Sequence, residues 1–313
     1  MKTPAFWAKR GILAYALSPL GAITAMLTAR RVGKAGFNPG IKIICAGNAG
    51  AGGAGKTTVV LDFLSRLKGP AFALTRGYGG RLAGPVLVDP SVHTAADVGD
   101  EALLLAAAAP TIVARDRAAG AKLALAEGAA VVVMDDGLQN PSLVKTLSVL
   151  VVDGGYGFGN GMLLPAGPLR EPVASAAARC QAAVLIGADE TGALAALPPG
   201  LPVLRAALVP DCARSLSRRR VIAYAGIGRP EKFFRSVLSL GADIAATHAF
   251  PDHHVYTALD SARLLNEAAE LGATLVTTAK DYVKLPPRLR AASLLVSVRL
   301  QWENEAALEA LLK

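Results

Sequence analysis

The chain has 313 residues, of which 52% are hydrophobic and 18% are charged. This composition excludes a disordered chain, and the length favours two domains with ample buried core. The formal net charge of +9 favours anionic partners, such as lipid headgroups or phosphorylated small molecules. Nucleic acid is disfavoured as a partner, because aromatic residues make up only 5% of the chain and no basic stripe is interleaved with them.

The first predicted element is an apolar helix near the amino terminus. Residues 11–29 carry no charge and lie between two basic pairs, Lys9-Arg10 and Arg30-Arg31. A helix of this length nearly matches the hydrocarbon core of a membrane, about 30 Å. Pro19 interrupts it, and small or polar residues recur every three to four positions: Gly11, Tyr15, Ser18, Gly21, Thr24, Thr28 and Arg31. These features favour a helix, or a broken helix pair, lying in the membrane interface over a true span or an ordinary core helix.

Beyond a Gly-containing loop at residues 36–40, short apolar runs alternate with Ala- and Leu-rich stretches. This alternation predicts an α/β fold with a parallel sheet covered on both faces. The predicted strands are residues 41–46, 71–74, 111–113, 131–134, 149–152, 184–186, 221–225 and 275–277. A Pro- and Arg-rich stretch at 197–220 interrupts the alternation and is the candidate linker. The predicted organisation is a membrane-associated segment (1–36), a P-loop domain (37–205), a linker (206–220) and a smaller α/β domain (221–313).

A phosphate-binding loop follows the first predicted strand. Residues 50–57 match G-x-x-x-x-G-K-[ST] between a strand and a predicted helix. Glycines let backbone amides face phosphate oxygens, Lys56 reaches the β- and γ-phosphates, and Thr57 offers its hydroxyl to Mg²⁺. The predicted nucleotide-binding residues are Gly50, Ala51, Gly52, Gly53, Ala54, Gly55, Lys56, Thr57 and Thr58.

Two adjacent acids end the strand at 131–134. Asp135 and Asp136 come directly after this apolar run. Carboxylates at the carboxyl end of a strand beside a phosphate loop commonly hold Mg²⁺ or its waters, so both are predicted magnesium-site residues. The alternative, a solvated turn acid, stays open.

The three cysteines, Cys45, Cys180 and Cys212, lie far apart and form no C-x-x-C pair. An odd, scattered set predicts reduced thiols in a cytosolic compartment rather than a disulfide framework or a zinc site. Cys45 lies in a mostly apolar run, where a small buried side chain is the default interpretation.

Further strings of residues occur in an order typical of one family. They are TRGYGG (75–80), GDE (99–101), DDGLQ (135–139), GNG (159–161), LPAGPLRE (164–171), AGIG (225–228), FPDHH (250–254) and KD (280–281). With the phosphate loop and the amino-terminal helix, they make nearly the whole chain resemble the tetraacyldisaccharide 4'-kinases. The resemblance implies transfer of the γ-phosphate of ATP to the 4'-hydroxyl of an acylated glucosamine disaccharide 1-phosphate, the precursor of lipid A. It also implies Mg²⁺, a peripheral or monotopic place on the cytoplasmic face of the inner membrane, and no obligate protein partner.

The resemblance further implies residue roles. Asp100 is the expected catalytic carboxylate, oriented by His253 from the second domain, and Lys56 contacts the transferring phosphate. The expected magnesium-site groups are Thr57, Asp135, Asp136, Gln139 and Glu171, with the division of labour between the two aspartates left open. The residues expected to face the anionic sugar substrate are Arg117, Asn160 and Arg170. Tyr78 could lie on either the nucleotide side or the substrate side.

Two positions depart from the family pattern. Many members have His where this chain has Asn140, so a substrate contact there is altered or absent. The usual Glu before Lys280 is Ala279 here, and the motif at 280–281 is therefore given no catalytic role.

Other interpretations remain beside this one. On composition alone, Asp100 could cap the following helix, and His253 with His254 could lie in a surface loop. The main functional alternative is a membrane-recruited P-loop switch ATPase of the partitioning type. Such ATPases carry a signature lysine early in the loop, where this chain has Ala51. A basic nucleic-acid-binding ATPase is the third candidate, and steep salt dependence of nucleic-acid affinity would identify it.

Overall fold

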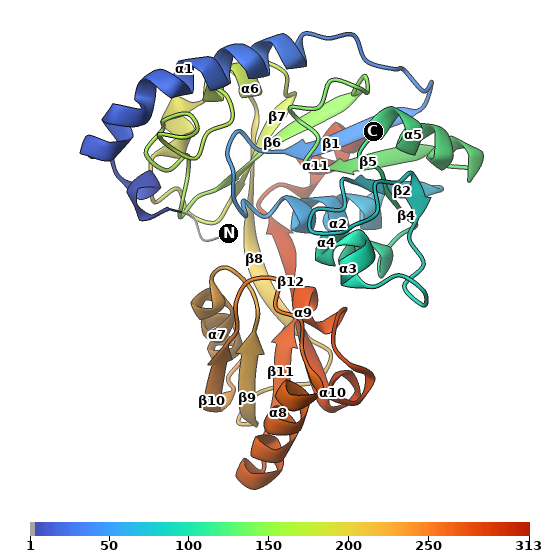
Figure 1. Cartoon of the computed structure of the whole chain (residues 1–313), viewed down its shortest axis with the longest axis vertical. Helices are drawn as coiled ribbons and strands as arrows, with labels where there is room; N and C mark the ends of the chain where they lie inside the picture. Colours follow the sequence, from blue (N-terminus) through green and yellow to red (C-terminus); the bar gives the residue numbers. More distant parts are fainter. Residues whose placement is uncertain (1–3) are drawn as a thin grey trace.

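A computed structural model describes residues 4–313. Within this range one twelve-stranded sheet runs through the molecule in the order β10-β9-β11-β12-β8-β7-β6-β1-β5-β2-β4-β3. Figure 1 shows two lobes, with β8 and β12 running from one to the other. The mixed α/β class and the large, mostly parallel sheet confirm the predicted fold class.

The first lobe is built on seven strands of apolar sequence. They are β1 (Lys42–Gly47), β2 (Ala71–Thr75), β3 (Val86–Leu87), β4 (Thr111–Val113), β5 (Val131–Asp135), β6 (Leu147–Asp153) and β7 (Ala182–Ile186). β1 pairs in parallel with β5 and β6, and Ala46 lies opposite Asp135. Because the carboxyl ends of parallel strands share one edge, this register brings the loop after β1 beside the acids that end β5.

Helices cover both faces of this sheet, which is why its strands are apolar on both sides. The helices are η1 (Ala5–Ala8), α1 (Ile12–Val32), α2 (Lys56–Arg66), α3 (Ala95–Val98), α4 (Asp100–Ala106), α5 (Arg117–Ala126), α6 (Val173–Ala177), η2 (Ala193–Ala196) and α11 (Glu305–Leu312). Two buried clusters result, one on each face, around Ile43 and Leu74 on one side and Ile44 and Phe63 on the other.

The second lobe repeats this layering on a smaller scale. Its strands are β9 (Arg220–Ala225), β10 (Asp243–Ala249) and β11 (Thr274–Thr278), which pair in parallel. Its helices are α7 (Pro230–Ser239), α8 (Ala258–Leu271), α9 (Ala279–Tyr282) and α10 (Pro287–Ala292). Phe233 and Val237 are buried on one face of this sheet, and Tyr224 and Leu264 on the other.

Two long strands join the lobes. β8 (Val203–Cys212) and β12 (Ser293–Trp302) pair antiparallel from Ala206 opposite Trp302 to Cys212 opposite Val296. The stretch predicted as a linker, 206–220, is therefore strand over its first seven residues. The sequence did not indicate this strand, because its burial alternates and Pro210 lies within it.

The carboxyl-terminal residues return to the first lobe, so the predicted second domain (221–313) does not hold all of them. Leu308 and Leu312 of α11 are buried in a first-lobe cluster. The Trp302 ring stacks on Phe63, with 6.4 Å between centroids, and its Nε1 donates to Asp62 at 3.0 Å. The second lobe is thus inserted between β8 and β12.

All eight predicted strands are confirmed, and their ends agree with the observed strands to within two residues. All three cysteines are free thiols in the described chain.

The amino-terminal helix α1 is continuous, so the alternative of a broken helix pair is wrong, and Pro19 lies inside it. Its small and polar side packs on the first lobe. A Cβ on Gly21 would lie 3.1 Å from Leu163 Cβ, while the hydroxyls of Thr24 and Thr28 donate to backbone carbonyls at 2.6 and 3.0 Å. Gly21, Thr24 and Thr28 of the predicted small and polar stripe therefore face the protein, whereas Gly11 and Arg31 are exposed.

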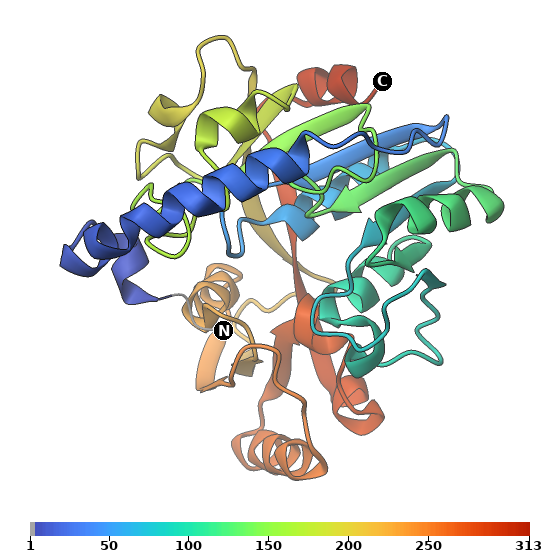
Figure 2. The same cartoon turned by 45° about the horizontal axis from the view of Figure 1, so that its top comes forward.

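Large apolar side chains occupy the outer side of α1. They are Ile12, Leu13, Tyr15, Leu20, Ile23, Met26 and Leu27, each about half exposed or more. Tyr15 was assigned to the small and polar stripe and lies on this outer side instead. Only 11% of the most apolar part of α1 is buried, and its length and composition also suit a membrane span. Figure 2 shows α1 lying across the first lobe with its outer side uncovered.

Candidate active site

The phosphate loop connects β1 to α2 as predicted. Gly55 precedes α2 with φ of +84°, in the left-handed region, and a Cβ there would lie 2.6 Å from Ile186 Cδ1. Lys56 begins the helix, and its Nζ donates to Asn48 Oδ1 at 3.2 Å and lies 3.6 Å from Asp136. The loop therefore presents a cation beside the positive end of α2, which suits a phosphate.

Asp135 has the environment of a cation ligand. Its Oδ2 accepts a hydrogen bond from Thr57 Oγ1 at 3.0 Å, whereas its Oδ1 is buried without a partner. Burial raises the pKa of Asp135 to about 6. A buried carboxylate oxygen without a donor is costly, so Asp135 and Thr57 together fit a magnesium ion.

Asp136 lies between two cations. Its backbone has φ of +55°, unusual for a residue with a side chain. Arg170 Nη1 donates to both of its carboxylate oxygens at 3.1 Å, and Lys56 is nearby. Burial acts to raise the pKa of Asp136, but Lys56 and Arg170 outweigh it and hold the pKa below its usual value. Asp136 is thus ionised and faces the phosphate loop.

Gln139 and Glu171 lie together behind these acids. Gln139 Nε2 donates to Asn48 O at 2.7 Å and to Glu171 Oε1 at 2.8 Å. Both oxygens of Glu171, which is almost fully buried, accept from Arg179 Nη2 at 2.7 and 2.8 Å. Glu171 is therefore neutralised by Arg179, a partner that the sequence analysis missed, and its nearest role is to orient Gln139. Within residues 4–313 no group of three His, Cys, Asp or Glu side chains could by itself hold a metal ion.

Asp100 and His253 come from different lobes and meet. His253 Nδ1 lies 3.1 Å from Asp100 Oδ2, and since a carboxylate only accepts, Nδ1 carries the donated proton. Gly99 is the N-cap residue of α4, so the interpretation of Asp100 as a helix cap is wrong. Gly99 has φ of +88°, and a Cβ there would lie 2.3 Å from Tyr78 O. Only glycine allows this close approach, which fixes Asp100 beside the loop that carries Tyr78.

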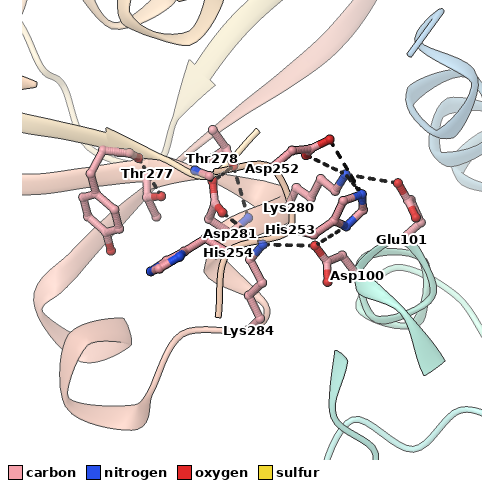
Figure 3. Close-up of polar contacts among 12 residues, drawn as sticks. Asp100, Glu101, Asp252, His253, His254, Thr277, Thr278, Lys280, Asp281 and Lys284 are labelled. Carbon is pink, nitrogen blue, oxygen red and sulfur yellow. Dashed lines mark hydrogen bonds and ion pairs between the residues drawn. The ribbon is translucent and has the colours of Figure 1, made fainter. Parts of the chain in front are cut away.

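Two lysines of the second lobe also reach α4, as Figure 3 shows. Lys280 Nζ lies 3.2 Å from Glu101 Oε1 and 3.4 Å from His253 Nε2. Lys284 Nζ donates to Asp100 Oδ2 at 3.0 Å. Lys280 belongs to a quoted motif, but the sequence analysis missed Lys284. The available signal was its position three residues after Asp281, in the turn that follows α9.

The three predicted substrate residues have different surroundings. Arg170 is one-third exposed and lies beside Asp136. Arg117 is buried at the start of α5, where it donates to Ala114 O, and burial with the nearby Arg76 lowers its pKa to about 10. Its Nε is buried without a partner among the described residues.

Asn160 is satisfied by the protein itself. Its Nδ2 donates to Ala166 O at 3.0 Å, and its Oδ1 accepts from Met162 N at 3.0 Å. These hydrogen bonds hold the loop that follows, so Asn160 has a structural role in this loop. Its predicted substrate contact remains a prediction.

A pocket opens beside the phosphate loop. It is lined by residues 48–54, by Tyr156 and Phe158, and by Arg229 of the second lobe. The Arg229 guanidinium lies 5.4 Å from the centre of the Tyr156 ring, so the two lobes both contribute walls.

Comparisons with known proteins give the family of the chain. The family model for tetraacyldisaccharide-1-P 4'-kinase, LpxK, matches residues 13–313. The chain belongs to this family. A tetraacyldisaccharide 4'-kinase of Rhodospirillum centenum is 53% identical over 100% of the chain and 96% of that protein. One from Gluconacetobacter diazotrophicus is 54% identical over 100% of the chain and 97% of its own length.

A solved structure carries the same fold. A crystal structure of LpxK from Aquifex aeolicus, described as an "apo" form in complex with ATP, superimposes with a TM-score of 0.78 at 26% identity. The match covers 96% of this chain and 98% of that one. Membership of the LpxK family confirms the predicted function, an ATP-dependent kinase of lipid A biosynthesis that phosphorylates the 4'-hydroxyl of a tetraacylated disaccharide. The alternative of a switch ATPase is not favoured.

Proposed function

We propose that the kinase reaction takes place between the two lobes, with Asp100 as general base, Lys56 at the transferring phosphate and Mg²⁺ held near Thr57, Asp135 and Asp136. The observation that most supports this is the meeting of Asp100 and His253 across the lobes, 3.1 Å apart. Glu101, the next residue of α4, pairs with Lys280 of the second lobe at 3.2 Å, so a second contact joins the lobes at the start of α4.

Asp100 and Lys56 have separate roles in the reaction. A sugar hydroxyl has a pKa far above 7, so Asp100 accepts its proton as the oxygen bonds to the γ-phosphorus. The bond from that phosphorus to the bridging oxygen of ADP breaks, and Lys56 stabilises the charge that develops on the phosphoryl oxygens. Bound Mg²⁺ would neutralise phosphate charge. Gln139 and Glu171 support this site from behind, and the Tyr156–Arg229 pocket accommodates the rest of the nucleotide.

The substrate side of the proposal rests on charge. Arg117 and Arg170 would contact the anionic, acylated disaccharide, since a guanidinium forms strong hydrogen bonds with phosphate. Thr28 of α1 donates to the backbone carbonyl of Arg170 at 3.0 Å. The apolar helix and the substrate-facing arginine are thus joined directly, which suits a substrate with lipid chains.

We expect labelled phosphate to pass from ATP to an acylated glucosamine disaccharide 1-phosphate, and mapping to place it on the 4'-oxygen. Removing divalent cations with a chelator should stop transfer, and added Mg²⁺ should restore it. An acceptor lacking the 4'-hydroxyl is the control and should remain unlabelled. Label at another position, or full turnover under chelation, would contradict the proposal.

We also propose that the outer side of α1 lies in the cytoplasmic face of the inner membrane. Replacing Ile23 and Leu27 with Glu should weaken binding to anionic vesicles about tenfold or more, because a charge in the apolar layer costs roughly 1–3 kcal/mol. The measurement is vesicle co-sedimentation, with ATP binding followed in parallel.

The matched control places two Glu residues at Leu238 and Leu259, exposed positions of the second lobe. This control should bind vesicles as the wild type does. High salt should weaken binding only in part, because screening reaches the basic residues and not the apolar contact. Equal loss in both double variants, or full release by salt, would exclude an apolar anchor.

A further inference from the structure

Lys284 is a buried lysine at the contact between the lobes. Its side chain is only 5% exposed, and its Nζ lies 3.0 Å from Asp100 Oδ2 and 3.2 Å from Asp281 Oδ1. Asp100 belongs to the first lobe, whereas Asp281 and Lys284 belong to the second. Figure 3 shows the ammonium between the two carboxylates. A buried ammonium is stable only when it is paired, so the position of Lys284 is fixed by both.

Asp281 holds its end of this arrangement rigidly. It is fully buried, and its Oδ2 accepts from Gly226 N at 2.9 Å and from Thr278 Oγ1 at 2.7 Å. Its Oδ1 makes the ion pair with Lys284 and no hydrogen bond. The direction in which Lys284 points is therefore set within the second lobe.

Both second-lobe donors bind the same oxygen of Asp100. Lys284 Nζ and His253 Nδ1 lie 3.0 and 3.1 Å from Oδ2, while Oδ1 accepts no hydrogen bond from residues 4–313. Oδ1 is also not fully buried, so it keeps some contact with solvent. Two donors on Oδ2 fix the rotation of the carboxylate and leave Oδ1 free.

We propose that Lys284 is a positioning residue which, together with His253, holds Asp100 so that Oδ1 faces the hydroxyl that is phosphorylated. This inference rests on the proposed role of Asp100 as general base. An ammonium on Oδ2 reduces the basicity of the Asp100 carboxylate. Lys284 therefore orients this carboxylate and keeps it ionised, but does not make it a stronger base. Because both donors belong to the second lobe, Asp100 is held in this orientation only when the second lobe is in place.

Several charged groups act on Asp100 in this position. From the second lobe these are His253, Lys284, Lys280, Asp252 and Asp281, and from α4 itself it is Glu101. Burial acts to raise the pKa of Asp100, but the bond from His253 and the charge of Lys284 hold it below its usual value. Removing Lys284 should raise this pKa, so the acid limb of the rate profile should move to higher pH.

The test measures kcat and KM over a range of pH for Lys284→Met and Lys284→Arg. We expect Lys284→Met to lower kcat about tenfold or more, with KM for ATP changed less than about threefold, and to shift the acid limb upward. Lys284→Arg keeps the charge, so it should recover part of kcat and return the acid limb toward that of the wild type.

Two further combinations of variants distinguish a positioning role of Lys284 from a purely stabilising one. In Asp100→Asn, removing Lys284 should lower kcat less than about twofold, because residues that act as a unit are not additive. Lys284→Met also leaves Asp281 buried and unpaired and could prevent folding. The double variant Lys284→Met with Asp281→Asn removes both charges, keeps an acceptor for Gly226 and Thr278, and should still show the loss of kcat.

The outcomes are distinct. A wild-type kcat and acid limb in Lys284→Met, or in the double variant with Asp281→Asn, would overturn the inference and leave Lys284 a stabilising residue. The same fold-loss with and without Asp100 would also overturn it. If Asp100→Asn itself has the turnover of the wild type, the proposed base is wrong. If Asp100→Asn is impaired and Lys284→Met is not, only the role of Lys284 fails.

Discussion

Replacing Lys56 with Met is expected to lower turnover at saturating ATP and Mg²⁺ about 100-fold or more. Lys56 begins α2 beside the phosphate loop, and its Nζ is held by Asn48 and Asp136 rather than by solvent. One preorganised group that stabilises transition-state charge is typically worth about 10²–10³ in rate. The measurement is steady-state phosphorylation of the lipid acceptor.

Lys68 provides the control for this substitution. It is exposed just beyond the end of α2, so Lys68→Met removes the same charge away from the phosphates. That variant should have close to wild-type turnover. A Lys56→Met enzyme with wild-type kcat would exclude Lys56 from the transferring phosphate.

Replacing Asp100 with Asn is expected to lower kcat about 100-fold or more with little change in KM for ATP. Proton acceptance in the transition state contributes about 10²–10⁴ in rate, whereas ground-state nucleotide binding does not depend on it. Because the pKa of Asp100 lies below its usual value, the base stays ionised at neutral pH and loses activity only as the pH falls toward that pKa. Titration of Asp100 should therefore leave the rate profile of the wild type flat near neutrality on its acid side.

His253 extends this prediction to a double-mutant cycle. His253→Ala should also lower kcat, because its Nδ1 is one of the two donors on Asp100 Oδ2. The double variant with Asp100→Asn should be no worse than about the poorer single variant, since the pair acts as a unit. Multiplicative losses would give His253 a separate role, and an unimpaired Asp100→Asn would leave Asp135 or Asp136 as the next candidate base.

The parts of the fold that the sequence predicted share one property. The confirmed strands are central and apolar on both faces, as in β1 and β5, so a short run of hydrophobic residues identifies them. β10 and β12 were not predicted, because β10 is a partly exposed edge strand and the burial of β12 varies along its length. The pairing of β8 with β12 joins residues about ninety positions apart, and local patterns carry no information on it.

Some residues of the candidate site could likewise be predicted from local sequence patterns, and others could not. Lys56, Thr57 and Asp135 could be predicted because a motif and a strand end fix their place in the chain. The pairing of Lys284 with Asp100 has no comparable pattern, because Asp100 lies in the other lobe. Arg179 lies outside every recognised motif, although its partner Glu171 is only eight residues away. The sequence predicted that α1 is apolar, but not which of its residues lie on its outer side. Tyr15 lies there because the packing of Gly21 and Thr24, and not polarity alone, sets which side faces the protein.

The return of α11 to the first lobe has a consequence for how the protein is made. Leu308 and Leu312 complete a cluster that includes Ile44 of β1, and Lys42 Nζ donates to Leu312 O at 2.6 Å. During translation, β1 and the phosphate loop leave the ribosome long before these partners exist. The inserted lobe can finish folding first, while the catalytic lobe waits for the last turn of helix. Ribosome-bound chains that end before α11 should therefore expose apolar surface to chaperones, and we expect them to gain the ability to bind nucleotide only near the end of synthesis.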